Sequence, residues 1–140
     1  MQPKTISQGT PGQKFVTDRK TITEEEQTQF CHITANTLPS FLTDEAAQSK
    51  GWERRLVPGV MTMSCSIGLM EQAGFLDDVV AFMAVEKLRY LAPVYIDDTL
   101  QVEVEFMGKK SVKDGSRTII FYKFKTYNQD GHPVLEAQNT

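Results

Sequence analysis

The chain has 140 residues and a formal net charge of −3, with acidic and basic residues interspersed. This length fits one domain with a substantial buried core, and the dispersed charge excludes the clustered basic face that binds nucleic acid or anionic membranes. The sequence opens without a signal-peptide pattern and holds no apolar run near the roughly 20 residues that span a bilayer, so we expect a cytoplasmic protein without membrane contact.

The N-terminal segment, residues 1–13, is polar and carries scattered prolines and glycines. We expect this segment to be a loose, flexible arm. A single domain then follows over residues 14–140, and it begins with a short strand at Lys14–Arg19.

A capping box marks the first helix. Thr23 is placed to accept the backbone amide three residues on, and Glu26 can reach back to the amide of Thr23. The helix continues to about Ile33, and we expect Phe30 and Ile33 to face inward. After an irregular stretch, residues 43–51 form a second short helix.

The stretch from about residue 58 to 73 is the element around which the rest of the chain is organised. Pro58 suits a helix start, and Gly74 suits a left-handed cap at the end. Apolar residues recur at helical spacing, at Val60, Met63, Ile67 and Met70. Because no charged residue interrupts the stretch before its last turn, we expect a helix that other elements enclose.

The chain after this helix has the pattern of β-strands. Residues 82–91, 100–106 and 118–127 alternate apolar and polar side chains and are rich in β-branched and aromatic residues, and 133–135 is a short final strand. One helix followed by an antiparallel meander predicts an α+β fold in which the sheet curls around the helix.

The two cysteines, Cys31 and Cys65, lie within predicted helices in apolar surroundings. Their spacing matches neither a metal site nor a disulfide framework, so we interpret both as small buried hydrophobic residues. The sequence gives no indication of a metal or a cofactor.

Five segments follow one another along the chain at Thr23–Glu25, Phe30, Thr34–Phe41, Pro58–Val60 and Pro93–Asp98. Together they resemble the MaoC-like hot-dog family of (R)-specific enoyl-CoA hydratases and 3-hydroxyacyl dehydratases. In that family the corresponding motifs are a Thr-Glu-Glu-type cap and a following Phe, a Thr-Gly-Asp-x-Asn-Pro-x-His loop, a His-Gly-Met helix start, and a Pro-Val-x-x-Gly-Asp-like turn. The resemblance extends from about Phe15 to Ala137.

The resemblance implies a hot-dog fold, in which an antiparallel sheet wraps around one long central helix. It implies an acyl thioester as ligand, with the acyl group carried by CoA or by a carrier protein. It also implies a homodimer or a pairing with a related hot-dog chain, since a single hot-dog sheet leaves an edge strand that invites association.

The loop that carries the family's catalytic residues departs from the pattern. Alignment places Asn36 at the catalytic aspartate, Leu38 at the asparagine and Phe41 at the histidine. An amide does not titrate near neutrality and a phenyl ring carries no proton, so the usual proton transfer is not expected. Related dehydratases use a glutamate on the central helix, and Ser64 occupies that position here.

The binding apparatus that the resemblance implies can survive these replacements. Relatives polarise the thioester carbonyl with backbone amides at the start of the central helix, and here Gly59, Val60 and Met61 stand at that start. Leu38 and Pro39 are expected to contribute to the same site. Leu38 and Phe41 would line an apolar acyl tunnel, although core filling explains both residues equally well.

Other candidates for chemistry have simpler interpretations. His32 and His132 fit solvated histidines, and Ser64 and Cys65 lack the neighbouring base and acid that an activated nucleophile needs. Three functions remain open: an enzyme acting on an enoyl or 3-hydroxyacyl thioester by an altered mechanism, a non-catalytic thioester-binding subunit, and a tailoring thioesterase or cyclase of secondary metabolism.

Overall fold

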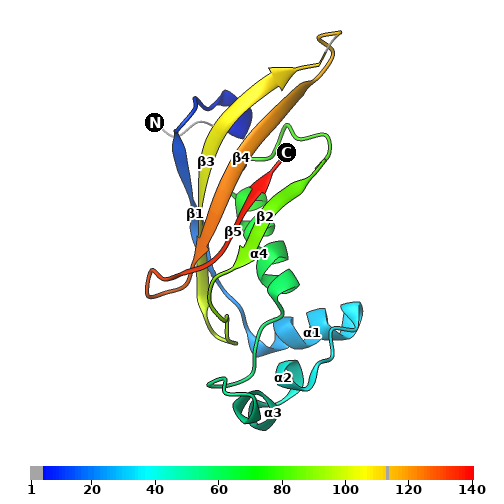
Figure 1. Cartoon of the computed structure of the whole chain (residues 1–140), viewed down its shortest axis with the longest axis vertical. Helices are drawn as coiled ribbons and strands as arrows, with labels where there is room; N and C mark the ends of the chain where they lie inside the picture. Colours follow the sequence, from blue (N-terminus) through cyan, green and yellow to red (C-terminus); the bar gives the residue numbers. More distant parts are fainter. Residues whose placement is uncertain (1–4, 113) are drawn as a thin grey trace.

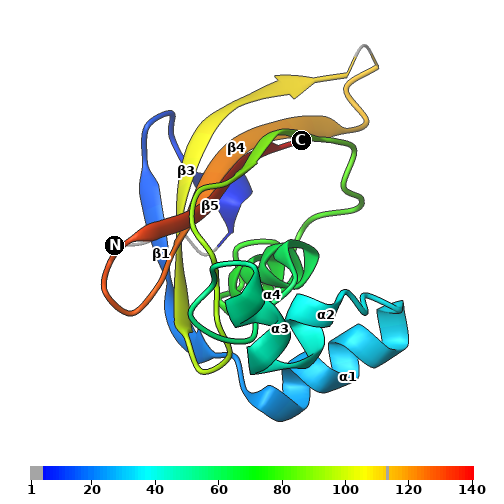
Figure 2. The ribbon, with the colours of Figure 1, turned by 60° about the horizontal axis from the view of Figure 1, so that its bottom comes forward.

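The computed structural model describes residues 5–112 and 114–140. Five strands form one antiparallel sheet in the order β1-β3-β4-β5-β2. The elements are η1 (Ile6–Gln8), β1 (Lys14–Thr21), α1 (Glu24–Thr34), α2 (Pro39–Leu42), α3 (Asp44–Ser49), α4 (Gly59–Gln72), β2 (Val85–Tyr90), β3 (Thr99–Ser111), β4 (Thr118–Tyr127) and β5 (Pro133–Asn139). The sheet curls around α4, and α1–α3 gather near the end of the molecule where α4 begins (Figures 1 and 2). This is the α+β architecture that the sequence predicted.

The central helix α4 begins at Gly59, directly after Pro58, and Gly74 beyond its end has a left-handed φ of 82°. Both ends agree with the prediction. Its buried face consists of Met61, Thr62, Ser66, Leu69 and Met70.

The expected enclosure of α4 is wrong for one side of the helix. Val60 is 49% exposed, Ser64 is exposed, and only Met70 of the predicted apolar stripe is fully buried. The sheet covers a single face, and that face carries small polar residues because they let helix and strand approach closely. Ser66 Oγ lies 2.6 Å from Thr126 Oγ1 of β4.

The alternation predicted for the third strand is confirmed, and the strand runs on to Ser111. Its inward side chains are at most 1% exposed, and they are Leu100, Val102, Val104 and Phe106. They form one wall of the hydrophobic core, which α4 closes from the concave side of the sheet.

Strand β2 differs from its prediction. It covers only Val85–Tyr90 and not residues 82–91, and all six of its residues are exposed. It lies at the sheet edge and pairs only with β5, with a bulge between Glu86 and Arg89 where Lys87 has a φ of 52°. The pairing starts at Val85 opposite Asn139, where β5 ends, so residues 82–84 lie beyond the regular ladder of their partner strand.

The N-terminal segment packs onto the domain from Thr5 onward, so the loose arm expected for residues 1–13 is wrong for its described part. Ile6 is 1% exposed, and its amide donates a hydrogen bond of 2.8 Å to the Phe75 carbonyl beyond α4. The hydroxyls of Thr5 and Ser7 both donate to the Asp78 carboxylate. Residues 1–4 of the expected arm lie outside the described residues.

The first helix has the predicted capping box. The Glu26 amide donates to Thr23 Oγ1 at 3.2 Å, and the Thr23 amide donates to Glu26 Oε1 at 3.2 Å. The predicted inward face is only half right, because Phe30 packs against the core whereas Ile33 is 80% exposed. Gln27 and Cys31, four residues apart on one face, are the buried residues of α1.

The two cysteines are free thiols. Cys31 is buried as predicted, and Cys65 on α4 is half-buried. Burial raises the pKa of both thiols above the usual value. Among the described residues, no group of histidine, cysteine and acidic side chains is arranged to hold a metal ion, and no helix has the length and apolar character of a membrane span.

Candidate functional site

The loop after α1 is fixed by a short chain of hydrogen bonds. Asn36 Nδ2 donates to Thr34 Oγ1 at 2.7 Å, and Thr34 Oγ1 donates to the Phe30 carbonyl at 2.6 Å. Between them, Ala35 has a φ of 58°, a left-handed conformation that closes the helix. These contacts hold the Asn36 amide group where the chain turns away from α1.

The segment that carries Phe41 is tied to the start of α4 through its backbone. The Phe41 carbonyl accepts hydrogen bonds from Gln27 Nε2 at 2.9 Å and from Arg55 Nε at 2.8 Å. Gln27 Nε2 also donates to the Leu56 carbonyl at 2.8 Å, and Arg55 Nη2 donates to Gln27 Oε1 at 2.7 Å. Gln27 is fully buried, so its side chain has exchanged water for these partners.

Gln27 and Arg55 are positioning residues that the sequence analysis missed. The expectation for α1 assigned its inward face to apolar residues, and a single glutamine on a helix looks solvated. Their role depends on a loop 14 residues away from Gln27 in sequence. No local pattern signals such a contact.

A cavity of about 550 Å³ lies between this loop, the start of α4 and the segment that follows β2. Its lining residues are Asn36, Leu38, Phe41, Trp52, Leu56, Val57, Pro58, Gly59, Val60, Thr62, Tyr90, Leu91, Ala92, Pro93, Val94 and Val134. Five of these residues are site candidates predicted from the sequence: Asn36, Leu38, Phe41, Gly59 and Val60. They come from two separate stretches of chain, and the fold brings them together.

Three other predicted site residues do not line this cavity. Pro39 is exposed at the first position of α2, and Met61 is 4% exposed within the core. Ser64 is exposed on α4, one turn beyond Val60. The helical rotation explains the last two positions, because Met61 turns toward the sheet and Ser64 turns along the uncovered side.

The cavity is lined almost entirely by side chains that carry no charge. Its lining residues in the described chain include no aspartate, glutamate, histidine, lysine, arginine or cysteine. His32 and His132 are exposed and lie outside the lining. The lining of this cavity therefore contains no pair of side chains suited to the proton transfer of the family's dyad.

Trp52, Tyr90 and Thr62 line the cavity, and the sequence analysis did not predict any of them. Tyr90 lies directly against the helix start, since a Cβ atom added at Gly59 would lie 2.7 Å from Tyr90 Cε1. Glycine lets the ring and the helix pack in this arrangement, and a larger residue at position 59 would force the ring to move. The contact joins residues 31 positions apart, which no local sequence pattern reveals.

The backbone amides of the first two residues of α4 are available to donate hydrogen bonds to a ligand. Pro58 supplies its carbonyl to the amides of Met61 at 2.9 Å and Thr62 at 3.1 Å. The amides of Gly59 and Val60 have no acceptor within the described part of the chain, as expected for the first turn of a helix. Both residues line the cavity, so an oxygen atom bound there can accept from this positive end of the helix dipole.

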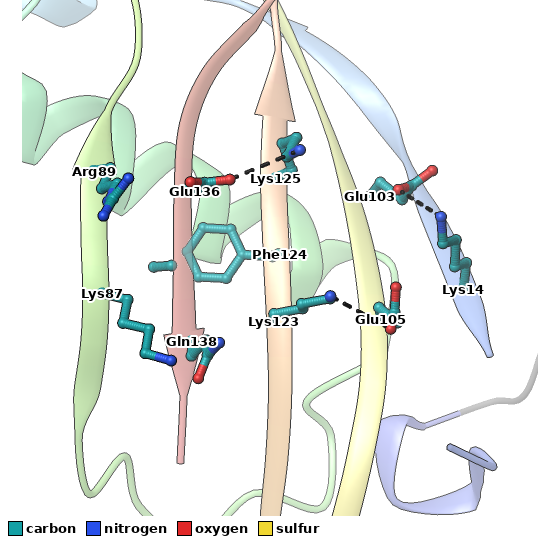
Figure 3. A pocket seen from close by; sticks show the side chains of 11 residues that line it. Lys14, Lys87, Arg89, Glu103, Glu105, Lys123, Phe124, Lys125, Glu136 and Gln138 are labelled. Atoms are coloured by element: carbon teal, nitrogen blue, oxygen red, sulfur yellow. Dashed lines mark ion pairs between the residues drawn. The ribbon is translucent and has the colours of Figure 1, made fainter. Parts of the chain in front are cut away.

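A second hollow, of about 360 Å³, lies on the outer face of the sheet (Figure 3). Three ion pairs cross it, at Lys14–Glu103 (3.6 Å), Lys123–Glu105 (3.6 Å) and Lys125–Glu136 (3.7 Å). All six side chains are at least 27% exposed, so each pair is solvated and weak. All of its lining residues belong to the strands, so this hollow is a charged surface of the sheet.

The family model described as MaoC like domain matches residues 6–127. Protein MaoC of Klebsiella aerogenes is 31% identical over 103 residues, which cover 74% of this chain and 30% of that protein. The uncharacterized protein YdeM of Bacillus subtilis (strain 168) is 28% identical over 136 residues, covering 95% of this chain and 94% of that protein.

Solved structures share the fold along nearly the whole chain. A monoamine oxidase regulatory protein from Archaeoglobus fulgius has a TM-score of 0.86 and 25% identity, covering 96% of this chain and 90% of that one. An (R)-hydratase from A. caviae involved in PHA biosynthesis has a TM-score of 0.77 and 22% identity, covering 94% and 95%. This chain spans less than a third of the length of Protein MaoC.

Proposed function

The chain belongs to the MaoC-like domain family, and from this premise we propose that it binds an acyl thioester in the cavity at the start of α4. The acyl group is carried by CoA or by a carrier protein. The observation that supports this function is the composition of the cavity, which combines an apolar lining with the open amides of Gly59 and Val60. Such a site accepts an apolar chain and a single polar carbonyl.

The two amides would hold the thioester carbonyl oxygen. They point from the first turn of a 14-residue helix, so no side chain is needed to supply the positive charge. The hydrogen-bonded Asn36 and the apolar Leu38 would flank the acyl group. In this proposal Asn36 and Phe41 replace the aspartate and histidine of the family, so the protein binds and polarises the thioester without hydrating it by a dyad.

Pairing with a second hot-dog chain is part of the proposal. The exposed edge strand β2 and the uncovered side of α4 offer surface for a second copy or a related chain. Two solved neighbours are named as complexes, HadBC and ChsH1-ChsH2, both of Mycobacterium tuberculosis. We propose a homodimer, which size-exclusion chromatography with light scattering would show as twice the chain mass.

Calorimetric titration tests the function directly. Butyryl-CoA is expected to bind in the titration and to raise the melting temperature in a thermal unfolding experiment. Crotonyl-CoA is expected to bind as well, and its enoyl absorbance should stay constant during incubation with the protein. Free CoA is the matched control, because it lacks the thioester carbonyl and the acyl chain. Failure of both esters to bind would contradict the function, and steady hydration of crotonyl-CoA would contradict the absence of a working dyad.

A further inference from the structure

Strand β2 carries two oppositely charged side chains, Glu86 and Arg89, that form no ion pair among the described residues. The three ion pairs of the outer face join only the other four strands. Glu136 lies opposite Arg89 in the register of β2 and β5, but it pairs with Lys125 of β4. Glu86 and Arg89 are therefore available to a strand that is added at this edge of the sheet.

The bulge in β2 turns both of these side chains to the same face of the sheet. Glu86 lies opposite Gln138 of β5, and Arg89 lies opposite Glu136, so three steps along β2 match two steps along β5. Residues opposite each other in an antiparallel pair share a face, and Gln138 and Glu136 both line the hollow on the outer face (Figure 3). In a regular strand, side chains three residues apart point to opposite faces. The bulge therefore brings Glu86 and Arg89 together on the outer face.

The inner face of β2 has an apolar or aromatic side chain at each end. Val85 and Tyr90 lie opposite two buried residues of β5, Asn139 and Leu135. Val85 is nevertheless 46% exposed and Tyr90 51% exposed, because β2 is the last strand of the sheet. An exposed edge with apolar side chains is a surface with which another strand can pair.

Pairing of β2 with β2 of a second copy has one register that uses the whole strand. In an antiparallel pair related by a two-fold axis, each contact between two positions occurs twice. When all six residues of β2 are paired, Glu86 lies opposite Arg89 of the second copy, and Val85 lies opposite Tyr90 of the second copy. Two ion pairs then form on the outer face and two pairs of a β-branched with an aromatic side chain on the inner face. Strand β2 is thus complementary to itself.

The two neighbouring registers are unfavourable. A slip of one residue in one direction places Lys87 opposite Lys87 of the second copy, and a slip in the other direction places Lys87 opposite Arg89 of the second copy. Like charges directly opposite each other on antiparallel strands are destabilising. The charges of β2 therefore favour the full register and disfavour the slips on either side of it.

We propose that β2 recognises a second copy of this chain through two symmetric ion pairs between Glu86 and Arg89, in the register that also pairs Val85 with Tyr90. This inference rests on the homodimer proposed above and names the contact that selects an identical chain. A related chain would fit only if its edge strand carried an acidic and a basic residue at the same spacing across a bulge.

Charge reversal tests the proposal, with the dimer dissociation constant of the full chain measured by analytical ultracentrifugation. Glu86→Arg places two pairs of arginines opposite each other, and Arg89→Glu places two pairs of glutamates opposite each other. Each single variant should raise the dissociation constant roughly thirtyfold, because two attractions become two repulsions. An equal mixture of the two variants should form a mixed dimer about as tightly as wild type, because every reversed side chain then faces an opposite charge.

Two further variants separate this contact from folding and from net charge. The double variant Glu86→Arg with Arg89→Glu restores both ion pairs in reversed order and should dimerise like wild type. Lys109→Glu makes the same change in net charge as Arg89→Glu, but it lies on β3, which β4 and β5 separate from β2. Its dimer dissociation constant should equal that of wild type.

Three results would overturn the proposal. Single variants that dimerise as tightly as wild type would refute the ion pairs and their register, and would leave the homodimer standing. Folded single variants whose mixture stays monomeric would show that their effect does not arise from a contact between Glu86 and Arg89. A wild-type chain that stays monomeric at every concentration would overturn the homodimer together with this contact, whereas thioester binding is decided independently by the calorimetric titration.

Discussion

The contact between Gly59 and Tyr90 gives the sharpest prediction for the cavity. A Cβ atom at position 59 would lie 2.7 Å from Cε1 and 2.8 Å from Cζ of the tyrosine ring, so Gly59→Ala forces the ring to move. Overpacking of this kind costs about 1–3 kcal/mol. Tyr90 is 51% exposed on an edge strand, so its ring has room to yield and we expect the lower half of that range.

The same substitution on another turn of α4 is the matched control. Gly68 has no heavy atom within 4 Å of an added Cβ, so Gly68→Ala should stabilise the protein by about 0.5–1 kcal/mol through its better helix propensity. One kcal/mol corresponds to about 3–5 °C in melting temperature for a chain of this length. Differential scanning calorimetry should therefore place Gly59→Ala below wild type and Gly68→Ala above it.

Binding should separate the two variants as well. Tyr90 and Gly59 both line the cavity, so a displaced ring should weaken butyryl-CoA binding about tenfold, which corresponds to about 1.4 kcal/mol. Gly68→Ala should bind like wild type. If Gly59→Ala were as stable as Gly68→Ala and bound the ester with unchanged affinity, the close packing at the helix start and its place in the site would both be refuted.

Three other predictions concern the loop, the buried network and the alkaline limit. The double variant Asn36→Asp with Phe41→His should gain measurable hydration of crotonyl-CoA, followed by enoyl absorbance; a folded but inert double variant would show that the cavity does not present the family geometry. Gln27→Leu removes buried hydrogen bonds and should lower the free energy of unfolding in urea by about 1–3 kcal/mol, whereas the exposed Gln29→Leu on the same helix should change it by less than about 0.5 kcal/mol. Equal effects of the two leucine variants would argue against the network. Burial raises the pKa of Tyr122 above its usual value of 10.0, because the folded state holds the phenol proton more tightly than the unfolded state does. The contribution of this proton to stability is complete below pH 10 and is lost as pH rises through the folded pKa, so the free energy of unfolding should fall above pH 10. A free energy of unfolding that stays constant above pH 10 would contradict the assignment.

Much of the fold could be predicted because its signals are local. The capping box at Thr23, the proline before α4 and the alternation around Val102 each act within a few residues. The tertiary environment then reinforced these local preferences, which is why the helix starts and the strand β4 lie where the sequence placed them.

The missed features all depend on distant partners. Ile33 is exposed because Gln27, bonded to the loop beyond α1, sets which face of the helix turns inward. Val60 is exposed because one sheet covers one side of a helix, however apolar the other side is.

The residues of the candidate site also fall into a group that could be predicted from the sequence and a group that could not. Asn36, Leu38, Phe41, Gly59 and Val60 lie on two stretches whose resemblance to the family is visible in the sequence. The packing of β2 and the rotation of α4 bring three further residues to the cavity, namely Tyr90, Trp52 and Thr62. Neither effect can be predicted from the neighbouring residues in the sequence.

The central claim is that the open amides of α4 hold a thioester carbonyl. A crystal structure with bound butyryl-CoA tests it most directly. We expect the carbonyl oxygen within about 3.2 Å of the Gly59 or Val60 nitrogen, with the acyl chain against the apolar lining of the cavity. An ester bound elsewhere, or bound in this cavity with its carbonyl turned away from both amides, would contradict it.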